Sequence, residues 1–391
     1  MKGVRRVGVG VVAVLLALAT VSCSDGADEE TAASTSAAPL TLGPVPLPDG
    51  VAPVAVASGG AEVLVGGRGP DGDPVRPRLW RSAAPGALTE VTVDPVSPTA
   101  YEARWFQLDV DPRGRVTAFA GAPAGAHANT RWSTWSGADD AVRELPQPFQ
   151  TFGGLGAGSL NALVRTPDGP VIIGSWQGSI GLDIAVWRRS GDRWTRTPTT
   201  AGSALASTPE ALVGARRATA RGGGVLATGS VTELGQGVVT LRAAAWLTDG
   251  LDEPWRRVDL PTTTTPAEAH ASVCDDDRCT VVGQAGGRLV AWTVADDGRA
   301  APVPGVPDVP VGDKVQLVAP VVADDGRHLL VVADGPAGHV VSFAADGSVR
   351  ERPYEAPGVP LSAAWASSGD LWVVHETPGG DESTLHTLRW D

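Results

Sequence analysis

The sequence predicts an all-β protein built from a repeated unit, and three observations predict it. First, 49 Gly and 32 Pro among 391 residues make up about a fifth of the chain, well above average usage, which argues against a helical protein. Second, residues 40–391 contain no long apolar pattern of period 3.6. They contain short apolar runs broken by Gly, Pro, Asp and Asn, which is typical of strands and turns. Third, those runs recur in a fixed order.

The N-terminal segment has the layout of an export signal. A basic start, MKGVRR, precedes the uncharged apolar stretch 7–21, which is too short to span a bilayer comfortably but has the length of a signal-peptide core. The stretch ends in TVSC, which resembles the lipobox of bacterial lipoproteins, with Thr20 where Leu is usual. The resemblance implies that residues 1–22 are a signal peptide and that Cys23 is lipidated. An ordinary signal peptide cut near Cys23 is the alternative.

Residues 24–39 contain no large apolar side chain and therefore cannot bury enough surface to order themselves. Together with Cys23 they are expected to form a flexible tether, residues 23–39, at the extracytoplasmic face of the cell membrane.

The repeated unit is an apolar strand, a turn ending in Gly or Asp, and a second apolar strand. Its seven copies occupy residues 51–67, 105–121, 160–176, 216–230, 269–284, 315–334 and 361–376. Each is followed by a third strand with an aromatic residue: Trp80, Trp135, Trp187, Trp246, Trp292, Phe343 and Trp390. Most copies end in a polar fourth strand that runs into proline. Four antiparallel strands repeated seven times predict a seven-bladed β-propeller over residues 40–391.

A four-stranded blade cannot bury both of its faces alone, so the third-strand aromatics are expected to be wedges between neighbouring blades. The last copy stops after its third strand. Residues 40–48 resemble the other fourth strands, and we expect this N-terminal strand to complete the last blade and close the ring.

Two outer-strand segments, 185–197 and 244–258, carry Asp, Gly and Trp and resemble degenerate Asp-box units. The resemblance is to bacterial sialidase-like propellers, in which Asp-boxes lie away from the catalytic face. Such catalysis would need a Tyr nucleophile with a Glu partner. The two tyrosines, Tyr101 and Tyr354, are each followed by Glu, but adjacent residues on an extended chain point to opposite sides.

Other catalytic and cofactor signals are missing from the sequence. No nucleophile elbow G-x-S-x-G, no P-loop and no H-E-x-x-H metal spacing occurs, so no cofactor and no metal site is predicted. Two weaker alternatives stay open. His375 and His386 could approach each other on adjacent strands, and Asp109 and Asp111 could help to hold Ca²⁺.

Charge excludes some partners. The formal net charge is −13, and an acidic surface repels phosphate, so neither nucleic acid nor an anionic membrane surface is an expected partner. Cys274 and Cys279 are separated by four residues between strand-like runs, and an exported chain meets oxidising conditions, so a disulfide across a hairpin is predicted. A metal site formed by the two thiolates and Asp275–Asp277 is the alternative.

Long connections in the first three or four blades are the candidate binding region, because scaffolded loops often carry binding residues. The candidate ligand-binding face comprises Tyr101, Arg131, Phe149, Phe152, Trp176 and Asp183. Alternatively, the aromatics hold their own loops on the ring.

These observations favour a membrane-anchored extracytoplasmic lipoprotein, a monomer that touches the membrane only through its lipid. Its propeller is expected to be a non-catalytic binding or scaffolding module for an envelope glycan or protein. The alternative is a glycan- or small-molecule-processing hydrolase or lyase, for which two carboxyls about 5–9 Å apart would be expected at the mouth of the central channel.

Overall fold

The computed structural model describes residues 38–60, 62–70, 75–124, 129–138, 140–235, 237–276, 278–312, 315–380 and 382–390. Cys23, the predicted signal peptide and nearly all of the predicted tether lie outside these residues. Within them the chain is all-β, with two four-residue helices, α1 (Pro98–Tyr101) and α2 (Phe149–Phe152). No helix of the described part is long and apolar enough to cross a membrane.

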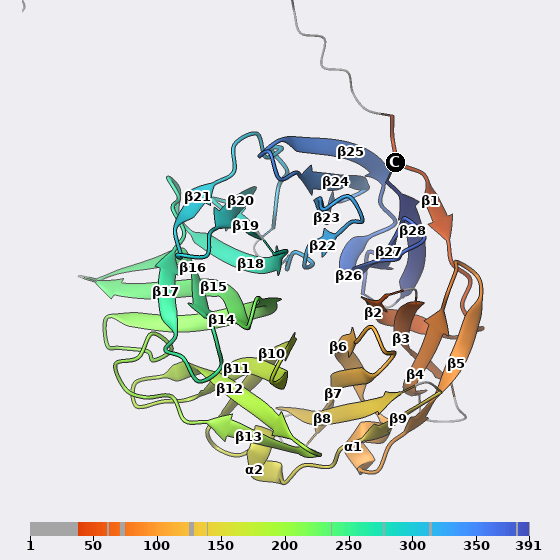
Figure 1. Cartoon of the computed structure of the whole chain (residues 1–391), viewed down its shortest axis with the longest axis horizontal. Coiled ribbons are helices and arrows are strands. Elements are labelled where there is room, and N and C mark those ends of the chain that lie inside the picture. The colour runs from red at the N-terminus through yellow and green to blue at the C-terminus, as the bar shows by residue number, and fades with distance from the viewer. Residues whose placement is uncertain are drawn as a thin grey trace, which may run out of the picture. The chain divides into compact units, whose positions relative to one another are not determined.

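The strands form consecutive antiparallel four-strand meanders around a common axis, with the first strand of each meander nearest the centre (Figure 1). The first two meanders are β2 (Ala52–Gly59), β3 (Glu62–Pro70), β4 (Val75–Ser82) and β5 (Leu88–Asp94), then β6 (Arg104–Val110), β7 (Val116–Ala124), β8 (Asn129–Ala138) and β9 (Ala141–Glu144). The next two are β10 (Ala157–Thr166), β11 (Gly169–Gln177), β12 (Leu182–Ser190) and β13 (Arg193–Thr197), then β14 (Ala211–Arg221), β15 (Gly224–Gly235), β16 (Val238–Thr248) and β17 (Arg256–Asp259).

The remaining strands continue this order. They are β18 (Ala267–Cys274), β19 (Cys279–Ala285), β20 (Arg288–Val294) and β21 (Ala300–Pro302), then β22 (Val321–Val322), β23 (His328–Asp334), β24 (Ala337–Phe343) and β25 (Val349–Glu355), and finally β26 (Val359–Trp365), β27 (Asp370–Glu376) and β28 (Ser383–Arg389). The strand expected to begin at residue 315 is reduced to the two residues of β22. Pro320 precedes it and has no N–H for a strand ladder.

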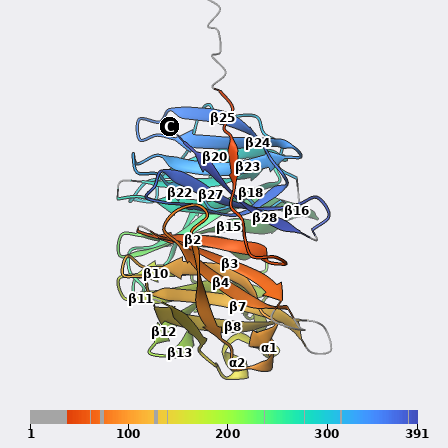
Figure 2. The ribbon, with the colours of Figure 1, turned by 90° about the vertical axis from the view of Figure 1, so that its right-hand side faces the viewer.

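The N-terminal strand β1 (Leu42–Pro44) pairs antiparallel with β28, as expected for residues 40–48. Leu42 lies opposite Leu388, and Val45 N donates to Leu385 O at 2.9 Å. Strand β1, coloured red-orange, lies beside β28 (Figure 2). The sheet of β26, β27 and β28 therefore takes its fourth strand from the opposite end of the chain.

One pairing has no signal in the sequence. The outer strands β5 and β9 pair parallel, with Thr92 opposite Ala141, and this joins the first two meanders into one eight-stranded sheet. The short parallel ladder holds the first two meanders together at their outer edges.

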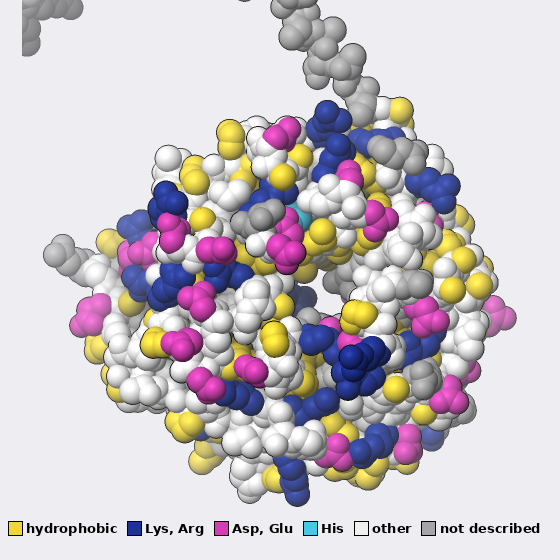
Figure 3. Space-filling model, in the orientation of Figure 1, with side chains coloured by type: hydrophobic (Ala, Val, Ile, Leu, Met, Phe, Trp, Pro, Cys, Tyr) yellow, Lys and Arg dark blue, Asp and Glu magenta, His cyan; other side chains and the backbone are white. Residues whose placement is uncertain are grey.

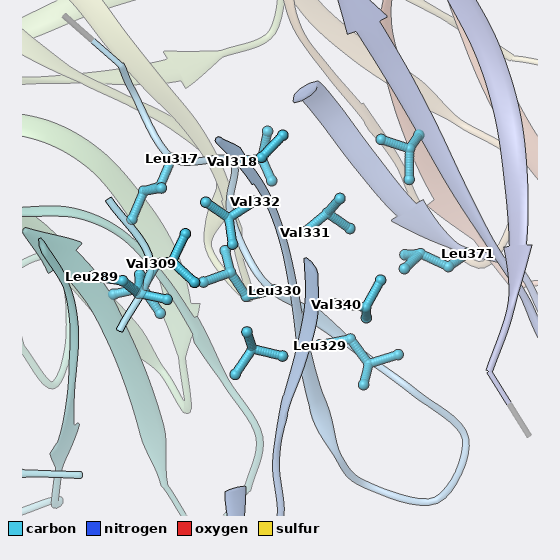
Figure 4. Close-up of a cluster of buried hydrophobic side chains, with 14 of the residues drawn as sticks. Leu289, Val309, Leu317, Val318, Leu329, Leu330, Val331, Val332, Val340 and Leu371 are labelled. Carbon is cyan, nitrogen blue, oxygen red and sulfur yellow. The ribbon is translucent and has the colours of Figure 1, made fainter. Parts of the chain in front are cut away.

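The core lies between neighbouring sheets. All seven third-strand aromatics are buried, and Trp135, Trp187 and Trp246 are fully so, which confirms their predicted place in the core. One cluster combines Leu289 of β20, Val331 of β23 and Leu371 of β27, which belong to three successive sheets (Figure 4). Each sheet thus buries its faces against its neighbours.

The third-strand tryptophans also fix the connections that enter their sheets. The indole N–H of Trp187 donates to Thr151 O at 2.8 Å, that of Trp246 to Ala204 O at 2.9 Å, and that of Trp292 to Pro261 O at 2.8 Å. Each acceptor lies in the connection from the preceding sheet, so the buried ring satisfies its one donor while it anchors a loop.

The meander topology gives the ring two faces. Turns between first and second strands and between third and fourth strands form one face, which we call the hairpin face. Connections from second to third strands and from one sheet to the next form the other, the long-connection face. The disulfide Cys274–Cys279 joins β18 to β19 at the hairpin face, as predicted.

Candidate functional site

Exposed large apolar side chains gather on the long-connection face. Among the described residues they are Val75, Val96, Tyr101, Phe106, Phe149, Leu155, Ile180, Leu182, Leu234, Val238, Val239 and Val359. Every one of them lies in a connection of that face or within three residues of a strand end that borders it. All except Val359 belong to the first four meanders or the connections between them. A one-sided concentration of this kind is typical of an interaction surface.

Arginine–aromatic pairs stand among these side chains. The Arg131 guanidinium lies 4.7 Å from the centre of the Phe149 ring, and Arg76 lies 5.0 Å from that of Tyr101. Arg131 and Phe149 line a cavity of about 210 Å³ between β8 and α2. The predicted residues Tyr101, Arg131 and Phe149 are thus at the surface of this face, and the cation–π contacts hold the aromatic rings in place.

Trp176 is partly exposed, with the Arg196 guanidinium 4.6 Å from its ring centre. Phe152 and Asp183 are buried. Phe152 packs 5.9 Å from the Trp187 ring, and Asp183 Oδ1 accepts a hydrogen bond from Ser207 N at 2.8 Å. These two side chains attach the connections on either side of β10–β13 to the ring.

The carboxylate beside the cavity of Arg131 and Phe149 is occupied by backbone donors. Glu144 is buried and accepts from Val96 N at 2.7 Å and from Ser97 N at 2.6 Å, and the Ser97 hydroxyl donates to it at 2.7 Å. Ser97 is the N-cap of α1, so Glu144 fixes the start of that helix. No sequence signal singled it out, because its partners lie 47 and 48 residues earlier in the chain.

A second cavity, of about 230 Å³, occupies the centre of the ring. We call it the central cavity. Its walls come from β2, β6, β14, β26 and the segment before β22, and they are mostly apolar, with Val54, Phe106, Leu108, Val318 and Leu361 among them. Figure 3 shows hydrophobic and basic side chains beside the central opening of the face in view.

One charged side chain, Arg217 of β14, lines the central cavity. The residue is half-buried, with its Nε fully so, and its guanidinium forms no hydrogen bond or ion pair with any described residue. Burial lowers the pKa of Arg217. The preceding Arg216 is different, because its Nε lies 2.5 Å from Glu268 Oε1 and its Nη2 donates to Glu268 Oε2 at 2.5 Å.

Glu268 has further partners. Ser230 Oγ donates to it at 3.0 Å, and His270 Nε2 lies 3.7 Å from its second oxygen. Burial is the main cause that lowers the pKa of His270 to about 4, so the ring is neutral near pH 7 and its Nδ1 accepts from Leu317 N at 3.2 Å. These groups tie β14, β18 and the segment before β22 together.

The weaker alternatives from the sequence are also placed. Asp109 forms an ion pair with Arg165. Burial alone would raise the pKa of Asp111, but hydrogen bonds from Arg115 and Arg113 outweigh it and lower the pKa to about 2. In the described part of the chain, no three His, Cys, Asp or Glu side chains are grouped to hold a metal ion.

His375 and His386 do lie together, with ring centres 5.5 Å apart. His375 is fully buried, and Tyr354 Oη lies 3.0 Å from its Nε2. Burial, with a smaller contribution from His386, lowers the pKa of His375 to about 3. This is a packed neutral pair on β27 and β28, the two middle strands of one sheet.

Comparison with known proteins shows the fold. No family model and no curated protein matches the chain. A catalytically inactive His-to-Ala variant of Staphylococcus aureus virginiamycin B lyase, solved with quinupristin, is similar at a TM-score of 0.56 and 12% identity over 90% of this chain and 100% of that one. A GH74 enzyme from Niastella koreensis has a TM-score of 0.53 at 12% identity over 88% of this chain and 55% of its own length.

An acylaminoacyl peptidase from Pyrococcus horikoshii gives a TM-score of 0.52 at 9% identity, over 87% of this chain and 51% of that one. The chain thus spans only about half of these last two enzymes. Four-strand meanders arranged around a common axis, together with the similarity to these solved structures, define an all-β protein with a β-propeller fold. At 9–12% identity the likeness extends to the fold and not to the activity.

Proposed function

We propose that this chain is an extracytoplasmic lipoprotein, attached to the cell membrane through Cys23, whose propeller binds a protein partner without catalysis. The propeller is proposed to be seven-bladed, with each meander as one blade and β1 completing the last. The docking surface is the long-connection face of the first four blades.

The one-sided set of exposed apolar side chains carries the proposal. Most of its members are aliphatic, such as Leu155 at full exposure and Val239 at 69%. Sugars stack on flat aromatic rings, whereas protruding aliphatic side chains gain most when a protein surface buries them. Arg131 beside Phe149 adds the residue types that are enriched at protein interfaces. These observations favour a protein over a glycan.

Three buried carboxylates on this side favour binding over the hydrolase or lyase alternative. Glu144 accepts from the start of α1, Asp183 accepts from Ser207 N, and Glu268 is engaged by Arg216. A general acid or base must reach a substrate proton, and each of these groups is already held by protein donors. The resemblance to sialidase-like propellers is proposed to concern the repeat and not the activity. The Asp-box-like segments form the hairpins β12–β13 and β16–β17, whose turns lie on the hairpin face, opposite the docking surface.

Site-specific photo-crosslinking on the tethered protein tests the docking surface. A photo-reactive phenylalanine replaces Leu155 or Val238 on the long-connection face, and Arg299, whose side chain is 85% exposed on the hairpin face, is the matched control position. We expect one protein adduct from the first two positions and none from Arg299. The purified adduct partner should bind the wild-type chain and bind the variant Leu155→Ser/Ile180→Ser at least about tenfold more weakly.

Other outcomes decide against parts of the proposal. An adduct that glycosidase removes would mean that the partner is a glycan, and equal crosslinking from Arg299 would reject the docking surface. For the anchor, Cys23→Ser should move the protein from the membrane fraction to the medium and abolish labelling by a fatty acid. Retention of both properties would reject lipidation at that residue.

A further inference from the structure

Arg217 is a half-buried cation in a mostly apolar cavity, and it forms no ion pair with a described residue. Val54, Phe106 and Leu361 in the wall offer no acceptor side chain. The wall also contains Ser58, Gln107 and Ser362, and the side chains of the last two accept hydrogen bonds from the backbone of Leu163 and Val56. The basic groups nearest to it in sequence or on the inner strands have acidic partners. Arg216 pairs with Glu268, and Arg165 pairs with Asp109 and Asp111.

Such an arrangement is costly for a purely structural residue. A half-buried charge without a partner loses part of its hydration and gains no ion pair in return, and natural chains usually pair or fully expose arginines for this reason. This chain has 44 Asp and Glu residues, yet among those described none is placed beside Arg217. An aliphatic side chain would fill the same position at lower cost. A cation kept here is therefore best explained by an anion that arrives from outside.

We propose that the central cavity binds a small amphipathic anion, with its carboxylate or phosphate paired to Arg217 and its apolar body against Val54, Phe106 and Leu361. The planar guanidinium can donate two parallel hydrogen bonds to either head group. At about 230 Å³ the cavity lies below the usual range for drug-sized ligands, so the ligand is a small organic acid or phosphate ester with one short apolar group or ring. Phe106, 46% exposed, stands at the long-connection end of the cavity.

Direct titration tests this site. The probes are phenylacetate, phenyl phosphate, and the uncharged phenylacetamide as matched control, each followed by calorimetry and ligand-observed NMR on the full chain. We expect phenylacetate or phenyl phosphate to bind, phenylacetamide to bind at least about tenfold more weakly, and acetate, which lacks the apolar body, to be similarly weak.

The variants are Arg217→Met, Arg217→Lys and, as a charge-matched control on the hairpin face, Arg299→Met. Arg217→Met should lose binding at least about tenfold, Arg217→Lys should retain part of it, and Arg299→Met should bind like the wild type. Arg217→Met should also unfold at about the same temperature as the wild type, because it removes no ion pair or hydrogen bond with a described residue, so loss of binding would not be due to misfolding.

Three results would each overturn the proposal. The first is equal binding of phenylacetate and phenylacetamide by the wild type. The second is that neither anionic probe binds, and the third is that Arg217→Met binds the anionic probes as well as the wild type does. These outcomes are separate from those of the docking surface, since Leu155→Ser/Ile180→Ser leaves the central cavity intact and Arg217→Met leaves the exposed apolar set intact.

Discussion

Glycines opposite the bulges of the inner strands should contribute to the stability of the ring, and Gly229 is the clearest case. Strand β14 bulges between Ala215 and Arg217, and Gly229 of β15 lies opposite Ala215. A Cβ at Gly229 would lie 2.9 Å from Ala215 Cα and closer still to Gly214 O. Both distances are shorter than 3.0 Å, the shortest distance that Cβ atoms normally keep from other heavy atoms. The obstacle is backbone on a paired strand, which cannot rotate away.

Gly229→Ala should therefore destabilise the protein by about 1–3 kcal/mol, the usual cost of forcing extra atoms into a packed site. The matched control is Gly235→Ala in the same strand, where a Cβ would have no neighbour within 4 Å. That substitution should be neutral or stabilise by up to about 1 kcal/mol, because alanine restricts the unfolded chain.

Thermal and urea unfolding of the two purified variants measures the difference. With an unfolding entropy of about 2.1 cal/mol/K per residue, each kcal/mol lowers Tm by roughly 1.4 °C in a folded region of this size, so Gly229→Ala should melt about 1–4 °C below the wild type. The same reasoning covers Gly174 and Gly283, whose Cβ atoms would meet Ser159 O and Glu268 O. Equal Tm values for Gly229→Ala and Gly235→Ala would refute it.

Three further predictions concern other parts of the fold. Replacing Cys274 and Cys279 by Ser should cost about 2 kcal/mol, since the closed loop is short, and should make urea unfolding insensitive to reductant; an unchanged midpoint would contradict this. Trp246→Phe removes the hydrogen bond to Ala204 O and part of a buried ring, so it should cost about 1–3 kcal/mol and speed proteolysis in the connection 198–210 relative to the wild type. His375 has a pKa of about 3 when folded and about 6.5 when unfolded, so the unfolded chain gains a proton first as pH falls. Stability should then decrease below pH 6.5 by up to about 1.4 kcal/mol per pH unit, and His375→Gln should flatten the profile between pH 6 and 4.

The features that the sequence predicts are those that depend on short stretches of consecutive residues. Alternating apolar runs and glycine turns define each strand pair, and Trp187 or Trp246 is recognisable as core because a large aromatic recurs at one strand position. The N-terminal strand was predictable because residues 40–48 resemble the other fourth strands. In each case the pattern lies in a short stretch of sequence, and its recurrence in successive repeats strengthens the prediction.

The central cavity depends on information that is not local. A bulge between Ala215 and Arg217 breaks the two-residue alternation, so the two adjacent arginines differ: Arg216 reaches Glu268 and Arg217 faces the axis. The sequence shows only a pair of arginines. Likewise, it does not show that Phe152 turns inward while Phe149, three residues earlier, stays 52% exposed. The outer pairing of β5 with β9 depends on how two meanders approach each other in space.

The direction of β1 relates the proposed anchor to the proposed docking surface. Because β1 runs antiparallel to β28, Leu42 lies opposite Leu388 near the hairpin face, and the chain reaches Pro44 as it moves toward the long-connection face. The chain therefore enters the ring from the hairpin face, where the described turns are rich in Asp and Gly. The exposed aliphatic residues are on the opposite face. With attachment at Cys23, as proposed, the point of entry and the docking surface are separated by the full length of the strands.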